Sequence, residues 1–117
     1  MKFFIVPVIL LIALNLIISS AQNDIPKCIQ EKINNILAEP VWNPPASIMK
    51  YLYNDKTMYL LSSDCCDQFN NLYDESCNYI CAPSGGFTGR GDGQCMNFHQ
   101  QAKFLGKVWV DTRGRGK

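Results

Sequence analysis

The sequence predicts an α+β domain, in which one N-terminal helix packs on a small antiparallel sheet of about four or five strands and disulfides staple the fold. Three observations predict it. Residues 26–38 carry apolar residues at helical spacing, the chain after them alternates short β-forming segments with polar turns, and six cysteines follow the first 21 residues. A helix and a sheet that each have an apolar side bury it by packing together.

The first 21 residues are predicted to be a secretory signal peptide. Lys2 precedes an apolar run over residues 3–18, and Ser-Ser-Ala follows at residues 19–21. A basic start, a short apolar middle and small residues before the cleavage point are typical of such a peptide. A membrane span needs about 20 apolar residues, and Pro7 and Asn15 interrupt this shorter run. We therefore expect an exported protein, periplasmic or extracellular, with no membrane span after cleavage.

The remaining chain is short enough that we expect one disulfide-rich domain over residues 22–111 and a basic disordered tail over residues 112–117. The full chain has 11 basic and 10 acidic residues, and cleavage would remove Lys2 and balance them. A balanced chain does not favour nucleic acid as a partner. We expect a monomer that binds no nucleic acid.

Residues 26–38 form the clearest predicted helix. Its apolar residues recur at the spacing of one helix face: Ile29, Ile33, Ile36 and Leu37. Asp24 is placed to cap the N-terminus, and Pro40 should end the helix. Cys28 lies in the first turn, so a disulfide from it would fasten the helix to the surface that it covers.

A first β-hairpin is predicted from residues 48–53 and 56–61, with a two-residue turn at Asn54-Asp55. The turn sets the register of the side chains that share each face. One face pairs Tyr51 with Met58 and Met49 with Leu60, and the other pairs Ile48 with Leu61 and Lys50 with Tyr59. We expect the first of these faces to lie beneath the helix.

A second hairpin is predicted from residues 68–73 and 78–81, around a polar turn. Residues 107–111 should add one short closing strand. Aromatic side chains on these segments could form an exposed binding face, but a chain this small must bury most of them to fold. They are Tyr51, Tyr53, Tyr59, Phe69, Tyr73, Tyr79 and Trp109.

All six cysteines are expected to form disulfides: Cys28, Cys65, Cys66, Cys77, Cys81 and Cys95. An even number in a short exported chain is typical of a disulfide framework. A bridge between the neighbours Cys65 and Cys66 would close a strained ring, so we expect them to reach two different partners. The sequence leaves the rest of the pairing open. Zinc is a weaker alternative, because no Cys-x-x-Cys pair is present.

Between Cys81 and Cys95 lies the most unusual segment, which contains five glycines. We call residues 82–94 the glycine loop. Glycine at this density permits positive φ angles and close backbone approach, at an entropic cost that flanking disulfides can offset. The candidate functional residues lie in or near this loop: Asp67, Gly85, Gly86, Gly89, Arg90, Gly91, Asp92 and Gly93.

Several short motifs accompany the loop, among them Cys-Cys-Asp at residues 65–67 and Gly-Asp-Gly-Gln-Cys at residues 91–95. With them the chain resembles a family of small exported bacterial domains of unknown function. The resemblance covers nearly all of the chain after the signal peptide, including the helix with Cys28. It implies no activity. It does imply that the glycine loop is a family trait, in which lysine can replace Arg90.

Two binding alternatives involve Arg90. Arg90-Gly91-Asp92 is the tripeptide that integrins recognise, but lysine at the first position would remove the discriminating residue. A basic residue on a cysteine-flanked loop is also found in protease inhibitors. Tight inhibition needs a loop that is already fixed in its bound shape, and the surrounding glycines argue against that rigidity.

A third alternative is a calcium-binding module or a small metal-dependent hydrolase that uses Asp67 and Asp92, because calcium prefers carboxylate and carbonyl oxygens. No EF-hand spacing is present, and aspartates in turns commonly accept hydrogen bonds from their own backbone. A pocket that gathered both aspartates and His99 would favour the hydrolase. With one histidine and oxidised cysteines, no nucleophile pair is indicated.

We therefore predict a non-catalytic binding or structural module of the cell envelope or exterior. We do not expect an enzyme. The expected partner is an unidentified protein or envelope component, and no cofactor is expected apart from calcium as an alternative.

Overall fold

The computed structural model describes residues 25–114. The described elements are α2 (Lys27–Leu37), β1 (Ser47–Tyr53), β2 (Lys56–Leu61), β3 (Phe69–Tyr73), β4 (Tyr79–Gly85), α3 (Phe98–Gln101) and β5 (Lys103–Val110). The predicted signal peptide, the Asp24 cap and residues 115–117 of the predicted tail lie outside this part of the chain. A small antiparallel sheet with helices and disulfides is confirmed. Helix α2 begins well inside the chain, so it is not N-terminal as the sequence predicted.

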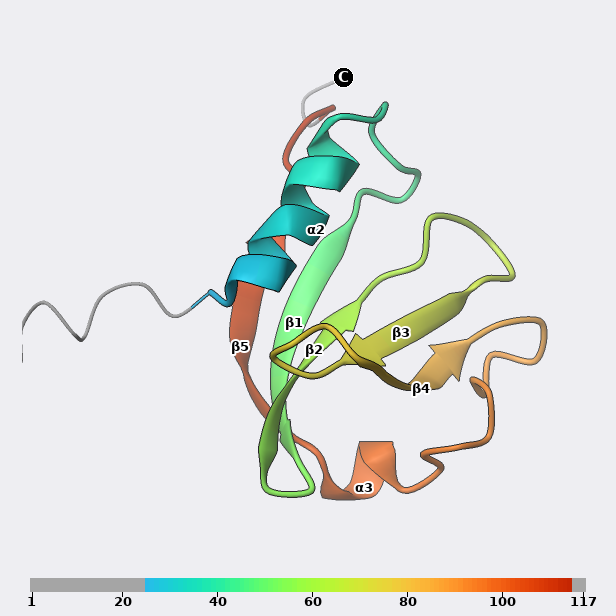
Figure 1. The fold of residues 1–117 in the computed structure, drawn as a ribbon. Coiled ribbons are helices and arrows are strands. Elements are labelled where there is room, and N and C mark those ends of the chain that lie inside the picture. The colour runs from blue at the N-terminus through green and yellow to red at the C-terminus, as the bar shows by residue number, and fades with distance from the viewer. Residues whose placement is uncertain (1–24, 115–117) are drawn as a thin grey trace, which may run out of the picture.

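The five strands form one antiparallel sheet in the order β4-β3-β2-β1-β5 (Figure 1). The β1–β2 hairpin has the predicted turn, where Asn54 and Asp55 both adopt positive φ angles. Two such residues favour a tight turn whose twist matches that of the strands. The predicted register is confirmed, with Tyr51 opposite Met58 and Ile48 opposite Leu61.

The second hairpin, β3–β4, and the closing strand β5 are also confirmed, and both extend beyond the prediction. Strand β4 continues to Gly85, into the segment predicted as loop. Strand β5 begins at Lys103 and pairs with β1 along most of its length. Exposed Phe104 and Leu105 follow each other at the start of β5, so the polar-apolar alternation that marks a strand is absent there.

Both faces of the sheet are covered. On one face, Ile29 and Ile33 of α2 pack with Ile48 and Tyr59 of the sheet. The other face forms a second core around Phe98 of α3, and this core consists of the buried residues Tyr53, Met58, Leu72, Cys81, Cys95 and Phe98.

The prediction of the face beneath the helix is therefore wrong. Tyr51, Met58 and Leu60 belong to the core around Phe98, whereas α2 lies over the side that carries Ile48 and Tyr59. Because both sheet faces are buried and apolar, polarity along the strands does not distinguish them. The position of the helix depends on contacts distant in sequence.

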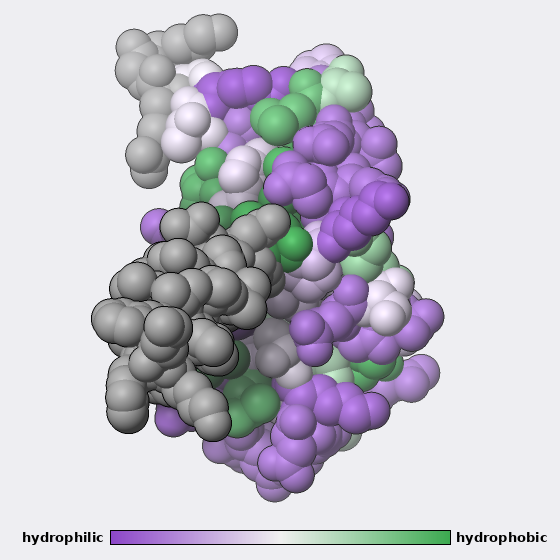
Figure 2. Space-filling model, turned by 60° about the vertical axis from the view of Figure 1, so that its left-hand side comes forward, coloured by the Kyte–Doolittle hydropathy of each residue, from purple (hydrophilic) through white to green (hydrophobic). Residues whose placement is uncertain are grey.

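Helix α2 has the predicted buried residues Ile29, Ile33 and Ile36, while Leu37 at its end is exposed. Pro26 occupies the N-cap position without a side-chain hydrogen bond to the helix, and its fixed φ suits a helix start. No helix among residues 25–114 is long and apolar enough to cross a membrane. In Figure 2, hydrophilic residues dominate the visible described surface, with smaller hydrophobic areas between them.

Arg113 makes specific contacts with the domain, although the sequence predicted a disordered tail over residues 112–117. Its guanidinium donates hydrogen bonds to both carboxylate oxygens of buried Asp111, from Nε to Oδ1 and from an Nη to Oδ2. It also donates to the backbone carbonyls of Ile36, Leu37 and Glu39 at the end of α2. The side chain thus supplies a positive charge and donors to the helix C-terminus, where free carbonyls favour a cation.

Candidate functional site

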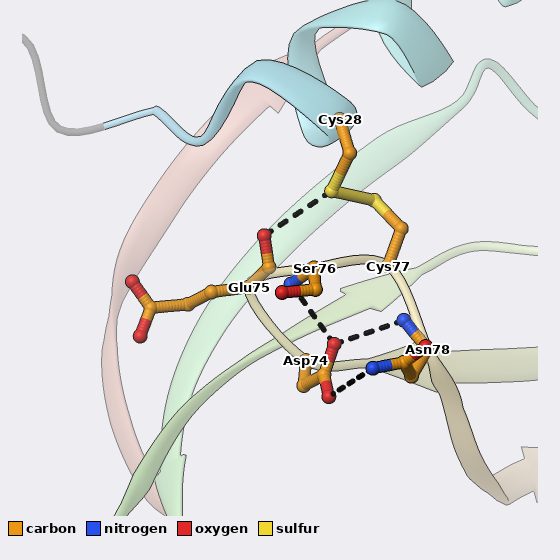
Figure 3. The surroundings of a disulfide bond; sticks show 6 residues. All are labelled: Cys28, Asp74, Glu75, Ser76, Cys77 and Asn78. Atoms are coloured by element: carbon orange, nitrogen blue, oxygen red, sulfur yellow. Dashed lines mark hydrogen bonds between the residues drawn. A yellow bond between two sulfur atoms is a disulfide. The ribbon is translucent and has the colours of Figure 1, made fainter.

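The Cys28–Cys77 disulfide joins the first turn of α2 to the β3–β4 turn. Cys28 Sγ lies 3.2 Å from the backbone oxygen of Glu75, as Figure 3 shows. Within the turn, Asp74 Oδ1 accepts hydrogen bonds from the backbone amides of Ser76 and Asn78. Partial burial acts to raise the pKa of Asp74, but these hydrogen bonds hold that pKa below its usual value. As expected, the bridge fastens the helix to the sheet.

The Cys81–Cys95 disulfide closes the glycine loop. Both cysteines are buried in the core around Phe98, so the two ends of the loop are fixed in the hydrophobic interior. The loop between them is thereby anchored to the body of the domain.

Backbone hydrogen bonds hold the glycine loop against the outer edge of β4. Asp92 N donates to Ala82 O at 2.9 Å, Gly91 N donates to Gly85 O at 3.0 Å, and Gly85 N donates to Gly89 O at 3.3 Å. These bonds pair groups that an edge strand would otherwise leave open to other chains. The loop is therefore more constrained than its glycine content suggested.

The glycines of the loop allow positive φ angles and a close approach of the backbone, the two uses expected from the sequence. All five, from Gly85 to Gly93, have positive φ angles. At Gly91 the backbone also approaches β4 closely, because a Cβ added there would collide with the backbone of Ala82 and Pro83. A Cβ at Gly89 would meet open space.

A hydrogen bond between Tyr79 and Asp92 ties the loop to β4. The hydroxyl of Tyr79 donates to Asp92 Oδ2 at 2.5 Å, and Asp92 Oδ1 accepts from the amide of Gln94. Partial removal from water, the hydrogen bond and the charge of Asp92 raise the pKa of Tyr79 to about 12. The hydrogen bond from Tyr79 in turn lowers the pKa of Asp92, against the effect of burial.

Two highly exposed apolar side chains lie on or beside this braced segment. The side chain of Phe87 is 90 % exposed and that of Met96 is 82 % exposed. Arg90, also exposed, lines a depression of about 280 Å³ together with Met96 and His99. His99 Nε2 lies 3.2 Å from the backbone oxygen of Pro83, which holds the imidazole at the rim. We call Phe87, Arg90 and Met96 the loop surface.

The structure does not bring the predicted acidic residues into one site. The depression beside His99 has Pro83, Gly89, Arg90 and Met96 as its other lining residues, and neither Asp67 nor Asp92 is among them. Within residues 25–114, no three His, Cys, Asp or Glu side chains are grouped so that they could hold a metal ion. Asp92 hydrogen-bonds within its own turn, as the simpler interpretation of the sequence expected.

The same bonds bear on the Arg90-Gly91-Asp92 tripeptide. Arg90 is exposed, but both carboxylate oxygens of Asp92 accept hydrogen bonds from Tyr79 and Gln94. Recognition of the integrin type requires the carboxylate on a metal. The geometry therefore favours a structural role for Asp92.

Cys65 and Cys66 form a disulfide with each other, so the prediction that they reach two different partners is wrong. The other four cysteines pair among themselves across distant elements, and this leaves the neighbours to each other. All six cysteines are bonded, so none is left as the thiolate that a zinc site needs.

The sequence prediction missed Phe87, Met96 and Tyr79 as members of the site. Phe87 is a large apolar residue within a run of glycines, and that isolation was the available signal. Met96 follows the last cysteine directly, where a bridge fixes the backbone. The sequence carried no signal for Tyr79, because its contact with Asp92 depends on the path of the whole loop.

The fold and this arrangement define a small disulfide-linked domain with a helix on one face of a five-stranded sheet. A family described as a domain of unknown function (DUF6970) matches residues 34–111, and the chain belongs to this family. The match begins within α2, so Cys28 lies outside it. No curated protein and no solved structure matches the chain.

Proposed function

We propose that the chain is an exported, non-catalytic binding module and that its loop surface recognises a protein of the cell envelope or exterior. The observation that carries the proposal is the exposure of Phe87 and Met96 on a segment fixed by the Cys81–Cys95 bridge and by hydrogen bonds to β4. Export is supported by the disulfide framework, since such bonds persist in oxidising compartments.

The physical advantage of this arrangement is preorganisation. Burial of apolar side chains on association contributes about 25 cal/mol per Å², but ordering a mobile loop consumes part of that gain. Here the backbone is already held, so a partner that covers Phe87 and Met96 does not have to order it. Arg90, which lines the same depression as Met96, adds donors that orient a polar or acidic group.

The metal-dependent alternative has less support. It requires Asp67 and Asp92 as ligands, yet both carboxylate oxygens of Asp92 accept hydrogen bonds. The loop surface carries no carboxylate pair that could act as acid and base. Binding is therefore the function that the geometry supports best.

Site-specific crosslinking tests the proposal. We expect the photoreactive residue p-benzoylphenylalanine at position 87 to give a discrete covalent adduct in the producing organism. At Phe104, which is 57 % exposed on β5, the same residue is the matched control and should give none. Adding Arg90→Ala or Met96→Ala to the position-87 variant should reduce the adduct severalfold.

Equal adducts at positions 87 and 104, or none at either, would contradict a binding role for the loop surface. Export is tested separately by locating the protein in cell fractions. Retention in the cytoplasm would contradict that half of the proposal.

A further inference from the structure

The Cys65–Cys66 disulfide differs from the other two bridges in what it connects. Cys28–Cys77 and Cys81–Cys95 join residues that are 49 and 14 positions apart. Bridges of that span stabilise a fold by restricting the unfolded chain. Cys65–Cys66 joins sequence neighbours and encloses no loop. The fold therefore gains little from it, and its loss should leave the domain folded.

The bridge is also the most accessible of the three. Cys66 is exposed and Cys65 half-buried in the connection between β2 and β3, whereas Cys28 and Cys77 are both half-buried and Cys81 and Cys95 are buried. The Cα atoms of neighbouring residues are about 3.8 Å apart, which is shorter than the roughly 4.4–6.8 Å of ordinary disulfides. Such a bridge is more easily reduced than an unstrained one.

A depression beside the bridge offers a place for a molecule to dock. It has a volume of about 470 Å³, and Cys65 lines it together with Pro40, Val41 and Trp42. The indole Nε1 of Trp42 donates to Glu39 Oε1 at 3.0 Å. The segment after α2 and the β2–β3 connection lie at the same end of the molecule in Figure 1.

We propose that Cys65–Cys66 is a thiol–disulfide exchange site whose substrate is a dithiol carried on a peptide or protein, which docks against Trp42. A substrate thiolate attacks the sulfur of Cys66, the exposed residue of the pair, the Cys65–Cys66 bond breaks, and Cys65 leaves as a thiolate that takes up a proton. The second substrate thiol then attacks the mixed disulfide. The substrate leaves oxidised, with its own disulfide, and the domain keeps the two electrons as the Cys65 and Cys66 thiols.

This site is separate from the loop surface and does not depend on it. It goes beyond the binding function, because it adds a redox reaction with a defined class of substrate. Exchange requires access to the sulfur under attack and a thiolate as nucleophile, and the choice of Cys66 for the attack rests on its exposed position.

Stepwise reduction of the purified, oxidised full chain tests the site. We expect dithiothreitol to make Cys65 and Cys66 reactive toward N-ethylmaleimide at a concentration at least tenfold below that needed for the other four cysteines, as mapped by peptide mass spectrometry. The circular dichroism spectrum should not change at that point. The proposal is overturned if another bridge is reduced first or at the same concentration, or if peptide mapping before reduction shows another pairing.

A second measurement tests the docking surface. A synthetic peptide with a Cys-x-x-Cys dithiol should be oxidised by the protein, and the Cys65→Ser/Cys66→Ser double variant should lose this reaction while remaining folded. Trp42→Ala should slow oxidation of the peptide severalfold but leave the reaction with dithiothreitol unchanged. Leu105→Ala, an exposed apolar residue on β5, is the control and should alter neither rate. Equal peptide rates for the Trp42→Ala variant and the unaltered protein would overturn docking at Trp42.

Discussion

The Tyr79–Asp92 pair shows how one contact can position a loop without a hydrophobic core of its own. The Tyr79 side chain is 48 % exposed, so it contributes less apolar burial than a core aromatic residue. Its hydroxyl instead donates to a carboxylate, and hydrogen bonds to a charged group are stronger than those between neutral groups. The pair thus joins strand β4 to the part of the glycine loop that follows Arg90.

This pair can be measured through the ionisation of Tyr79. Partial removal from water and the neighbouring Asp92 raise the pKa of Tyr79 to about 12, because the tyrosinate would be poorly hydrated, could not donate the hydrogen bond and would be repelled by the carboxylate. We expect the Asp92→Asn variant to lower this pKa toward the ordinary value of about 10. NMR of Tyr79 across alkaline pH, in the variant and in the unaltered protein, provides the measurement. An unchanged Tyr79 titration in the variant would contradict the contact.

At the scale of elements, the glycine loop owes its path to two different requirements. Positive φ costs an L-residue roughly 1–2 kcal/mol, and this applies at Gly89 and Gly91 alike. Gly91 has the further requirement of close approach, since a side chain there would collide with the β4 backbone. Substitution of Gly89 therefore carries only the cost of positive φ, whereas substitution of Gly91 adds a steric clash.

We expect Gly89→Ala to lower the free energy of unfolding by about 1–2 kcal/mol and to leave the loop in place. Gly91→Ala should cost more and detach the loop from β4, because Ala82 and Pro83 contribute rigid backbone atoms. Denaturant unfolding and amide exchange at Asp92, which donates to Ala82 O, check both effects. Equal losses of stability in the two variants would show that close approach is not the constraint.

Local signals predicted the elements that local physics determines. The Asn54-Asp55 turn specified the register of the first hairpin, and the isoleucines of α2 identified its buried face. Both sheet faces carry a hydrophobic cluster, so alternation along the strands could not show which one α2 covers. The Cys28–Cys77 bridge, whose pairing the sequence left open, ties the helix to its side of the sheet.

For the candidate site, the sequence indicated the loop, its bracing cysteines and its glycine conformations. It did not indicate the contacts that turn them into a surface. The Tyr79–Asp92 bond and the docking of the loop on β4 are long-range consequences of the fold. The pairing of Cys65 with Cys66 could not be predicted from spacing either, because it depends on how the fold pairs the other four cysteines.

At the scale of the whole molecule, the Asp111–Arg113 pair connects the end of the sheet to the end of the helix. Asp111 is buried beside the terminus of β5, and Arg113 bridges it to the last carbonyls of α2. The hydrogen bond from Arg113 holds the pKa of Asp111 below its usual value despite burial. Hydrogen bonds to Asp74 and Asp92 lower the pKa of each of these carboxyls as well.

These three shifts have the same sign and predict the acid response of the domain. A carboxyl with a lowered pKa in the folded state stabilises the fold fully above its unfolded pKa of about 3.9, and this contribution is lost as pH falls through the folded value. We expect the melting temperature to decrease when the pH is lowered below about 4.

In Asp111→Asn, the melting temperature should be several degrees lower at neutral pH and should depend less on acid, since Arg113 loses its charged partner. Asp67→Asn, at an exposed position, is the control and should retain the acid response. An identical pH profile for Asp111→Asn and the unaltered protein would show that the Asp111–Arg113 pair does not hold helix and sheet together.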